Sequence, residues 1–439
     1  MYPLRPEKIY AHEALRGNPD AMERMARFLA STHTSAADVD WFSPADAVRV
    51  SGELAGWRGD FGQPDWKFRQ PIVFTNFALA GTAAEDPVIA NKPEGESLYH
   101  LEYVLGYLPI FTPQHTPEKD ADSGMVCWPS MFLASVNGCS HGCVYCGSGR
   151  GGKALIIALN VKEYLDKGIR RVIEDNPWQK CFLMMGSADI ATLEPEYGLF
   201  EDFLNLLAEY DDRYGYFHTN GDCVDWVEGL THRERVIGVW SLCSNESAAL
   251  LEPCAPPASS RIEAMSKLCE WGVPVRVKMK PIIPIRDWRE SYAGCIDELL
   301  AKAKPETLGF TTMIWSTFER LERILDTDRL DPEFVAAARD AQEEMKDSRH
   351  GPFPHEMRAE MYRFLIAEAR KRDPDLPLFI STETARMWDE LAPVLGQNPR
   401  KFLCGCNPVQ GPGPRYVPST LTESNYATNT SAGRQERDR

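Results

Sequence analysis

The sequence has no long apolar stretch. Its start, Met1 to Tyr10, contains charged side chains and two prolines but no apolar segment of the kind that a secretion signal needs. Elsewhere, no uncharged hydrophobic run approaches the length of a membrane-spanning helix. We therefore expect a protein that works in the cytoplasm and has no membrane partner.

Positive charge is also scarce. The 439 residues include 48 Lys and Arg against 64 Asp and Glu, which gives a formal net charge of -16. Affinity for nucleic-acid backbones comes from clustered Lys and Arg side chains, so a nucleic acid is not expected as a partner. With 43% hydrophobic residues, a chain of this length can bury a large core.

Cysteine, in contrast, is plentiful. Twelve cysteines are spread over a large acidic chain without a recognisable export signal, so disulfides are not expected. Three of them, Cys139, Cys143 and Cys146, form a CxxxCxxC motif with Tyr145 directly before the last one. Three thiolates so close together can hold three irons of a 4Fe-4S cube and leave the fourth open to a small molecule. The alternatives are a zinc site, which normally uses four ligands in paired sets, and plain core thiols.

From residue 131 onward, apolar runs of strand length alternate with longer amphipathic segments. This alternation predicts parallel βα units joined by right-handed crossovers. The expected fold class is α/β, a partial TIM-type (β/α)6 barrel with N-terminal and C-terminal extensions. The expected strands are 131–136, 181–186, 214–219, 236–242, 273–279 and 308–314. The expected helices are 161–174, 199–210, 223–230, 259–271 and 288–303.

Four parts of the chain follow from this pattern. Residues 1–125 are an extension whose role the sequence does not reveal, and residues 126–320 carry the barrel. Residues 321–411 are expected to be helical, with a loop that closes the active site. Residues 412–439 are polar and predicted to be disordered.

Polar residues stand where the expected strands end. In a βα barrel the loops that follow the strands gather on one face, and that face carries the chemistry. Each of these residue types also serves in ordinary turns and helix caps, so a structural role is the alternative for any single one. The candidates, in chain order, are Gly186, Ser187 and Asp189, then Asn220, Ser241, Lys278 and Lys280.

The motif and its spacing resemble the radical SAM superfamily, whose open iron binds S-adenosylmethionine (SAM). Residues 131–315 further resemble the spore photoproduct lyase family of that superfamily. The resemblance rests on the cysteine motif, on Ser187-Ala188-Asp189-Ile190, on Val239-Trp240-Ser241-Leu242, and on the runs 256–264 and 281–292. It implies an incomplete barrel, a SAM-ligated cluster, and hydrogen abstraction by a 5'-deoxyadenosyl radical.

The positions of the candidate residues at the strand ends predict their roles at a SAM site. Tyr145, Gly186, Ser187, Asp189, Asn220 and Ser241 are expected to bind the cofactor. Asn220, Lys278 and Lys280 are expected to act on the substrate, with both lysines pointing into the barrel lumen toward a carboxylate or phosphate.

Two departures from the lyases argue against the lyase substrate. The lyases end the second strand with a cysteine that returns a hydrogen atom to the product, and this chain has Gly186 there. A lyase lysine near the SAM site is matched by Asn220. The C-terminal region also lacks the aromatic and basic run that accompanies lesion binding, so repair of a thymine dimer is not expected.

A second cysteine pair stands near the C-terminus, in Cys404-Gly405-Cys406. Glycine between two cysteines lets both sulfurs turn toward one metal group. We expect this pair to help bind an auxiliary iron-sulfur cluster, with Cys254 as the leading further ligand and Cys243 next. Two unrelated thiols in a surface turn are the alternative.

The sequence thus favours a radical SAM enzyme that abstracts hydrogen from a small molecule, possibly a nucleoside, as part of a biosynthesis. An auxiliary cluster would permit C-S bond formation, and an electron donor such as flavodoxin or ferredoxin would be required. Two alternatives stay open. One is a nucleic-acid lesion repair or modification enzyme of the lyase type, and the other is a non-catalytic iron-sulfur or zinc protein.

Overall fold

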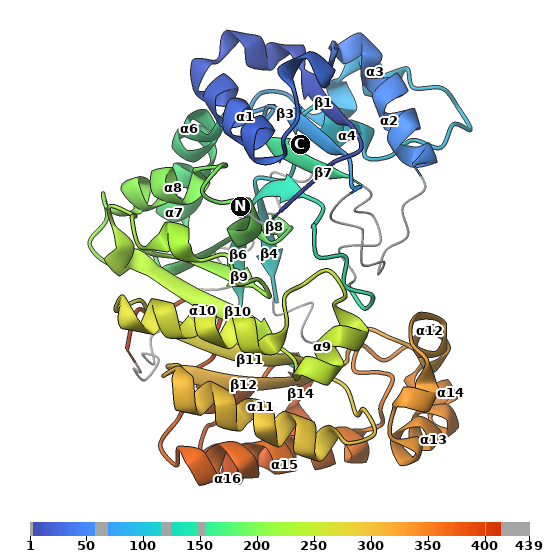
Figure 1. Cartoon of the computed structure of the whole chain (residues 1–439), viewed down its shortest axis with the longest axis vertical. Helices are drawn as coiled ribbons and strands as arrows, with labels where there is room; N and C mark the ends of the chain where they lie inside the picture. The colour runs from blue at the N-terminus through green and yellow to red at the C-terminus, as the bar shows by residue number, and fades with distance from the viewer. Residues whose placement is uncertain (1–2, 58–68, 116–123, 147–153, 400, 414–439) are drawn as a thin grey trace.

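The computed structural model describes residues 3–57, 69–115, 124–146, 154–399 and 401–413, and within these the side chains of residues 185–187 are not described. Its central feature is a row of parallel strands at the middle of the chain (Figure 1). These strands pair in the order β6, β8, β9, β10, β11, β12 and β13. Their bounds are β6 (Ser130–Asn137), β8 (Cys181–Ser187), β9 (Tyr214–Thr219), β10 (Val236–Leu242), β11 (Val275–Ile282), β12 (Thr307–Thr312) and β13 (Leu378–Ile380).

The expected fold class is confirmed: the parallel row is a partial radical SAM-type barrel with additions at both ends. Strands 214–219 and 236–242 have the expected bounds, and the others are shifted by one to a few residues. The long apolar runs specify strands well because both faces of a parallel sheet are covered.

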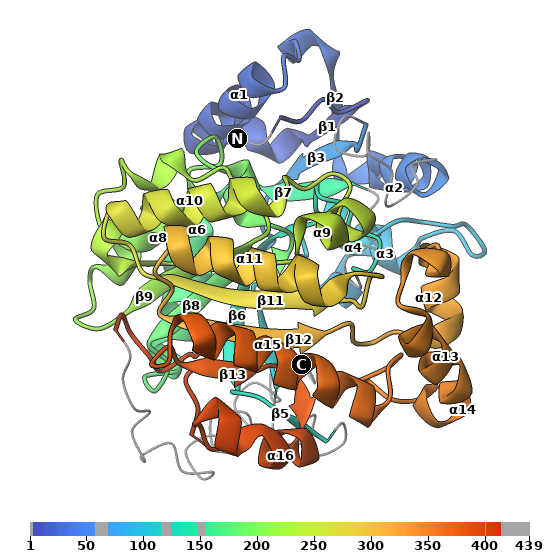
Figure 2. The same ribbon diagram turned by 60° about the horizontal axis from the view of Figure 1, so that its bottom comes forward.

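Helices lie against the outside of this row, and Figure 2 shows α10, α11, α15 and α16 in succession. In α11 the buried residues recur every three or four positions, which is the spacing of one helix face. Trp288 of α11 packs edge-on against Phe334 and Phe364 and so joins three helices. The helices of this part are α8 (Leu199–Leu207), α9 (Asn245–Leu251), α10 (Ala258–Glu270), α11 (Trp288–Lys302), α12 (Phe318–Ile324), α13 (Pro332–Asp340), α14 (Gln342–Met345), α15 (His355–Arg372) and α16 (Ala385–Leu395).

Two expectations about helices have different outcomes. The helix expected over 161–174 is present as α6 (Val161–Tyr164), a π-helical stretch (Leu165–Ile169) and α7 (Arg170–Asp175). The helix expected over 223–230 is wrong, because only a 3-10 turn forms at Asp225–Val227. There the Trp226 indole donates a hydrogen bond to the Cys223 carbonyl (2.8 Å), which ties the segment into a turn.

The N-terminal extension continues the same sheet instead of forming a separate body. Beyond β6 lies β7 (Leu155–Ala158), antiparallel to it, and then β3 (Ile72–Thr75), β1 (Ile9–His12) and β2 (Val39–Phe42) in parallel. With β4 (Phe111–Gln114) beside β6, the sheet has 12 strands in all. Helices α1 (Pro19–Ser31), α2 (Ala47–Gly56), α3 (Pro87–Ala90) and α4 (Leu101–Val104) belong to this region.

The C-terminal segment follows a path that the sequence did not predict. We expected it to cross the catalytic mouth, but residues 408–411 lie at the opposite ends of the strands. The Pro408 carbonyl accepts backbone hydrogen bonds from Lys180 (2.7 Å) and Cys181 (2.9 Å), where β8 begins. Arg276, at the start of β11, donates to the carbonyls of Gln410 (2.9 Å) and Gly411 (3.1 Å). Strand starts and a buried guanidinium both need acceptors, and this segment supplies them.

Inside the barrel a small apolar cluster of Cys181, Leu183, Tyr216, Ile237 and Val239 lines the lumen, and Cys406 packs against it. The C-terminal segment therefore forms the floor of the lumen. A two-stranded sheet of β5 (Met125–Val126) and β14 (Glu383–Thr384) lies nearby. The tail predicted to be disordered is, from residue 414, outside the described residues, and the division into four parts stays a prediction.

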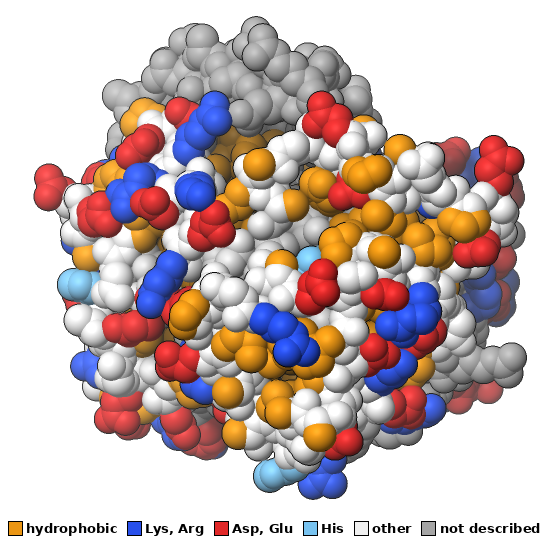
Figure 3. Space-filling model, turned by 90° about the horizontal axis from the view of Figure 1, so that it is seen from above, with side chains coloured by type: hydrophobic (Ala, Val, Ile, Leu, Met, Phe, Trp, Pro, Cys, Tyr) orange, Lys and Arg blue, Asp and Glu red, His pale blue; other side chains and the backbone are white. Residues whose placement is uncertain are grey.

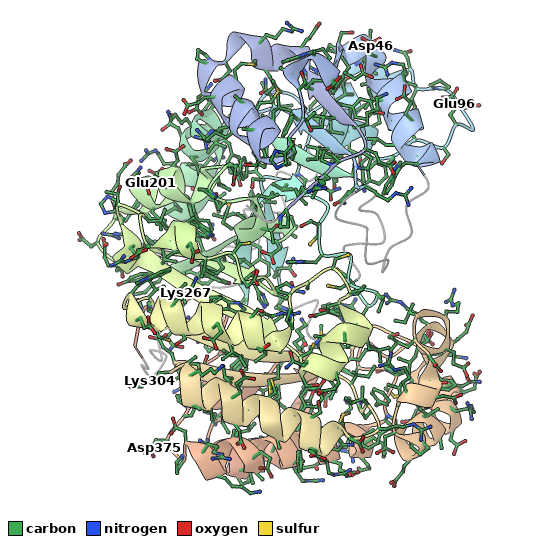
Figure 4. All side chains as sticks on the ribbon, in the orientation of Figure 1. Asp46, Glu96, Glu201, Lys267, Lys304 and Asp375 are labelled. Carbon is green, nitrogen blue, oxygen red and sulfur yellow. The ribbon has the colours of Figure 1, made fainter. Side chains whose placement is uncertain are left out.

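Charged side chains cover the outside. Glu201, Lys267 and Asp375 project from the surface in Figure 4, and on the face shown in Figure 3 basic side chains are interspersed with acidic ones. Among the helices of the described ranges, none combines the length and the apolar character that crossing a membrane requires.

Candidate active site

A cavity of about 510 Å3 opens at the C-terminal ends of the barrel strands and reaches into the lumen. It brings together most of the residues that the sequence singled out, from loops far apart in the chain. The predicted residues among its lining are Cys139, Cys143, Tyr145, Cys146, Asp189, Asn220, Ser241, Lys278, Lys280, Cys404 and Cys406. Gly186 and Ser187 end β8, but their side chains lie outside the described residues, so the predictions on them stay open.

A tight turn after β6 sets the position of the cysteine motif. Gly138 has φ 95°, and a Cβ atom there would lie 2.1 Å from the Ala154 carbonyl oxygen. Only glycine fits both conditions. After the turn, the Cys146 amide donates a hydrogen bond to the Cys143 carbonyl (3.0 Å), and the Val144 amide donates to the Leu251 carbonyl (3.0 Å). These two hydrogen bonds hold the loop in a compact shape.

The three motif thiols line one cavity, as the ligands of an iron-sulfur cube must. Burial is the main cause that raises the pKa values of Cys139 and Cys143, so thiolates here need nearby cations such as irons. The Asn220 side-chain amide lies 3.4 Å from the Cys143 sulfur and is a donor for it. Within the described ranges, no group of three His, Cys, Asp or Glu side chains is close enough to share one metal ion. A 4Fe-4S cube does not require three side chains around one ion, because each thiolate binds a different iron.

Asp189 is the centre of a buried hydrogen-bond network beside this loop. Its Oδ2 atom accepts hydrogen bonds from the Thr219 hydroxyl (2.6 Å) and the Asn220 backbone amide (3.2 Å). The same atom lies 3.0 Å from Nε2 of His141. Its Oδ1 atom is buried and has no hydrogen-bond partner among the described residues. A buried carboxylate oxygen without a donor is costly, so this atom is suited to an ammonium group in the cavity.

Two lysines from β11 line the lumen side. Met279 between them is buried in the main core, so Lys278 and Lys280 face the cavity as expected. Neither has a carboxylate within ion-pair distance in the described part of the chain. Burial, followed by the charge of Lys278, lowers the pKa of Lys280 to about 8.

Lys278 contacts the sulfur of Cys406. Burial acts to lower the pKa of Lys278, but the thiols of Cys406 and Cys404 outweigh it and raise the pKa. The two lysines therefore form a buried positive region between the motif loop and the CxC pair.

Comparison with known proteins agrees with this geometry. Residues 130–325 match the family model described as spore photoproduct lyase. These residues form a radical SAM domain of the spore photoproduct lyase family. The chain is accordingly a radical SAM enzyme. No curated protein sequence matches the chain.

Two solved structures of spore photoproduct lyase show the same fold, and a third, more distant structure shares a smaller part of the chain. A spore photoproduct lyase double mutant with bound AdoMet and dinucleoside spore photoproduct has a TM-score of 0.57 at 15% identity, covering 86% of this chain and 98% of that one. Spore photoproduct lyase complexed with dinucleoside spore photoproduct has a TM-score of 0.56 at 15% identity, covering 86% and 99%. Streptococcus suis SuiB bound to S-adenosylmethionine has a TM-score of 0.36 at 11% identity, covering 58% and 51%.

Within the radical SAM domain, Tyr145 is held from both sides. Its hydroxyl donates to Glu252 (2.7 Å), and its carbonyl accepts from Arg320 (2.9 Å). Glu252 is also paired with the buried Arg261 (2.5 Å). Because the hydroxyl is already hydrogen-bonded to Glu252, only the ring and backbone of Tyr145 can contact a cofactor.

Ser241 is paired with a neighbour on the next strand. Its hydroxyl lies 3.0 Å from Nε2 of His218, and both residues line the cavity. Burial and the charges of Lys278 and Lys280 hold the pKa of His218 well below its usual range, so the imidazole is neutral. Ser241 and His218 offer polar, uncharged contacts beside the lysines.

The structure does not bring Cys254 or Cys243 to this cavity. Cys254 is buried outside the cavity lining, and the Cys243 sulfur lies beside the Pro281 carbonyl (3.4 Å). Cys127, which the sequence did not single out, lines the cavity with Cys404 and Cys406. The auxiliary cluster and its ligands stay a prediction. Sequence reasoning missed Cys127 because it precedes the first barrel strand and stands outside both cysteine motifs.

Proposed function

We propose that this enzyme binds SAM at a 4Fe-4S cluster held by Cys139, Cys143 and Cys146 and removes a hydrogen atom from a small molecule in the lumen. The observation that carries the proposal is that the motif cysteines, the open Oδ1 atom of Asp189 and the two lysines share one cavity. A cluster held by these cysteines would supply one electron, taken from a donor such as flavodoxin or ferredoxin, for the cleavage of SAM to methionine and a 5'-deoxyadenosyl radical, which would take one hydrogen atom from the substrate.

The chain's own residues position the reactants. The Asp189 Oδ1 atom accepts a hydrogen bond from the methionine ammonium group, while Oδ2 is held by Thr219 and Asn220. The Asn220 side chain donates toward the Cys143 sulfur and so links the two parts of the site. Ser241 meets polar groups of the ligand at the next strand, where the neutral His218 supports its hydroxyl.

The lumen favours a small anionic substrate with a planar ring. A volume of about 510 Å3 lies within the range of pockets for small ligands. Lys278 and Lys280 supply two positive charges for a carboxylate or phosphate. Trp315 at the cavity is 49% exposed, and the Lys280 ammonium lies 5.6 Å from its ring centroid. An exposed indole beside a cation suits stacking of a nucleobase or a similar ring.

The product radical must be quenched without a hydrogen-donating cysteine at the end of β8, because this chain has Gly186 there. We propose that a second iron-sulfur cluster at Cys404 and Cys406 serves this purpose. It would accept one electron from the radical, with loss of a proton. Alternatively, a bridging sulfide would form a C-S bond to the radical carbon while an iron-sulfur bond breaks and one electron remains on iron.

A lesion-repair lyase is the second candidate, since the fold covers almost the whole of a lyase that carries a dinucleoside lesion. The acidic composition and Gly186 weigh against it. In that case the enzyme would convert dinucleoside spore photoproduct to two thymidines.

The decisive experiment uses anaerobically reconstituted enzyme, dithionite and SAM, with 5'-deoxyadenosine measured by mass spectrometry. We expect product from the wild type and from Cys269→Ala, a control on the outer helix α10, but none from Cys139→Ala/Cys143→Ala/Cys146→Ala. Cleavage by the triple variant would refute the proposal. Adding dinucleoside spore photoproduct to the same assay separates the candidates, because repair to thymidine would favour the lyase.

A further inference from the structure

The CxC pair has a third cysteine beside it. We infer that Cys127, Cys404 and Cys406 together hold the second iron-sulfur cluster. This inference deepens the proposed function and rests on it, since it names the ligands of the second cluster. The three thiols come from segments far apart in the sequence, one before the first barrel strand and two after the last helix.

Direct contacts tie the two segments together. The Trp128 indole, next to Cys127, donates to the Phe402 carbonyl (3.0 Å), and the two rings pack at 5.6 Å. On the N-terminal side of Cys127, β5 ends at Val126, which pairs with Glu383 of β14. Cys127 is therefore fixed between a strand pair and a hydrogen bond to the segment that carries Cys404.

The CxC turn is equally well fixed. The Asn407 amide donates to the Cys404 carbonyl (3.2 Å), and the Asn407 side chain donates to Phe402 (3.1 Å). A Cβ atom on Gly405 would lie 3.3 Å from Lys278 Cε and 3.5 Å from Val239 Cγ1. The glycine thus lets the turn approach the lysine that contacts Cys406.

The surrounding charge favours an anionic group at the three thiols. Lys278 is 6% exposed and has no carboxylate partner in the described part of the chain. Burying an unpaired cation costs several kcal/mol. Thiolates bound to a cluster would balance the charge of Lys278, which contacts Cys406, whereas three neutral thiols would not.

A buried hydroxyl gives a separate indication. Tyr216 is 1% exposed, its oxygen has no hydrogen-bond partner among the described residues, and it packs with Cys406 in the lumen. A cluster sulfur at Cys406 would accept this orphaned hydrogen bond, which no described group now accepts.

Other cysteines do not complete the set. The Cys181 thiol donates to the Gln410 carbonyl (3.0 Å), and Cys295 lies beside the Cys243 carbonyl on the helix side of the sheet. Three thiolates leave one iron of a cube without a protein ligand, as in the CxxxCxxC loop. That iron is available to an amine, carboxylate or thiol of the substrate.

The test uses a background that cannot hold the SAM cluster. In full-length Cys139→Ala/Cys143→Ala/Cys146→Ala protein, anaerobic reconstitution should leave about four irons per chain. Adding Cys127→Ala should remove most of this iron, whereas adding Cys254→Ala or Cys269→Ala should leave it. Iron and sulfide analysis with electron paramagnetic resonance of the reduced protein gives the readout, and none of these measurements depends on turnover.

Thermal unfolding of each protein before reconstitution separates loss of a ligand from loss of the fold. Cys127→Ser provides a second variant, which should keep part of the iron with altered resonance values because oxygen replaces one sulfur. Iron retained in Cys127→Ala but lost in Cys254→Ala would overturn the ligand assignment. A background protein that binds zinc or no metal would overturn the second cluster, while the SAM cleavage assay on wild type would still test the first.

Discussion

Replacing Asp189 by Asn changes one charge at the centre of the proposed SAM site and keeps the side-chain shape. Three donors point at Oδ2, from His141, Thr219 and Asn220. The Asn oxygen must take that position, because an amide NH2 there would face donors. The NH2 group then takes the place of Oδ1 and directs a donor at the methionine ammonium.

The magnitude follows from the lost interaction. A hydrogen bond to a charged group contributes about 1.5–3 kcal/mol, and about 1.4 kcal/mol corresponds to a tenfold change in affinity. Asp189→Asn should therefore raise the Kd for SAM by about 10- to 100-fold. Iron content should be unchanged, since Asp189 is not one of the proposed ligands.

Equilibrium dialysis of labelled SAM against the anaerobically reconstituted protein measures this Kd. Asp222→Asn is the matched control, because that carboxylate lies in the loop after β9 but outside the cavity lining. The control should bind SAM as the wild type does. An Asp189→Asn protein with wild-type Kd and full iron content would refute the role of the Oδ1 atom.

Two further predictions concern stability. Gly138→Ala should lower the free energy of unfolding by about 1–3 kcal/mol and reduce the iron bound at the motif, because the positive φ and the Ala154 carbonyl leave no room for a Cβ atom. Gly229→Ala is the control, since a Cβ atom there would lie in open space. Equal melting temperatures of the two variants would contradict the argument. Glu194 is buried at the start of α8, and burial raises its pKa to about 7. The folded state then holds the proton more tightly than the unfolded state, so stability should fall as pH rises from about 4.5 to about 7, by at most about 3 kcal/mol. Urea unfolding across this range should show a flatter pH dependence in Glu194→Gln, and equal slopes would show that the carboxyl is not perturbed.

The sequence predicted best what depends on local pattern. The runs that became β9 and β10 are rich in aromatic and β-branched residues, with turn residues on either side, and their bounds were found without error. The helix expected over 223–230 failed because a single indole hydrogen bond to Cys223 made a turn more favourable. Local periodicity contains no information about such a contact.

The candidate site, too, could be predicted from the sequence only in part. Asp189, Lys278 and Lys280 could be placed on the cavity because strand ends and strand alternation determine where side chains point. The neighbours of the CxC pair could not be found, since Cys127 approaches it through contacts between segments more than 250 residues apart in the sequence. Those contacts depend on how β5 pairs with β14, which two residues per strand cannot specify in a sequence.

The floor of the lumen has a consequence for the order in which the protein is made. The segment that pairs with Lys180, Cys181 and Arg276 is the last described part of the chain, so a ribosome releases it after every strand has been synthesised. Until then the lumen face of Tyr216 and its neighbours is open to water. The first cysteine motif can therefore be loaded on a nascent chain, whereas a cluster that needs Cys404 and Cys406 can be inserted only after residues 404–411 have left the ribosome.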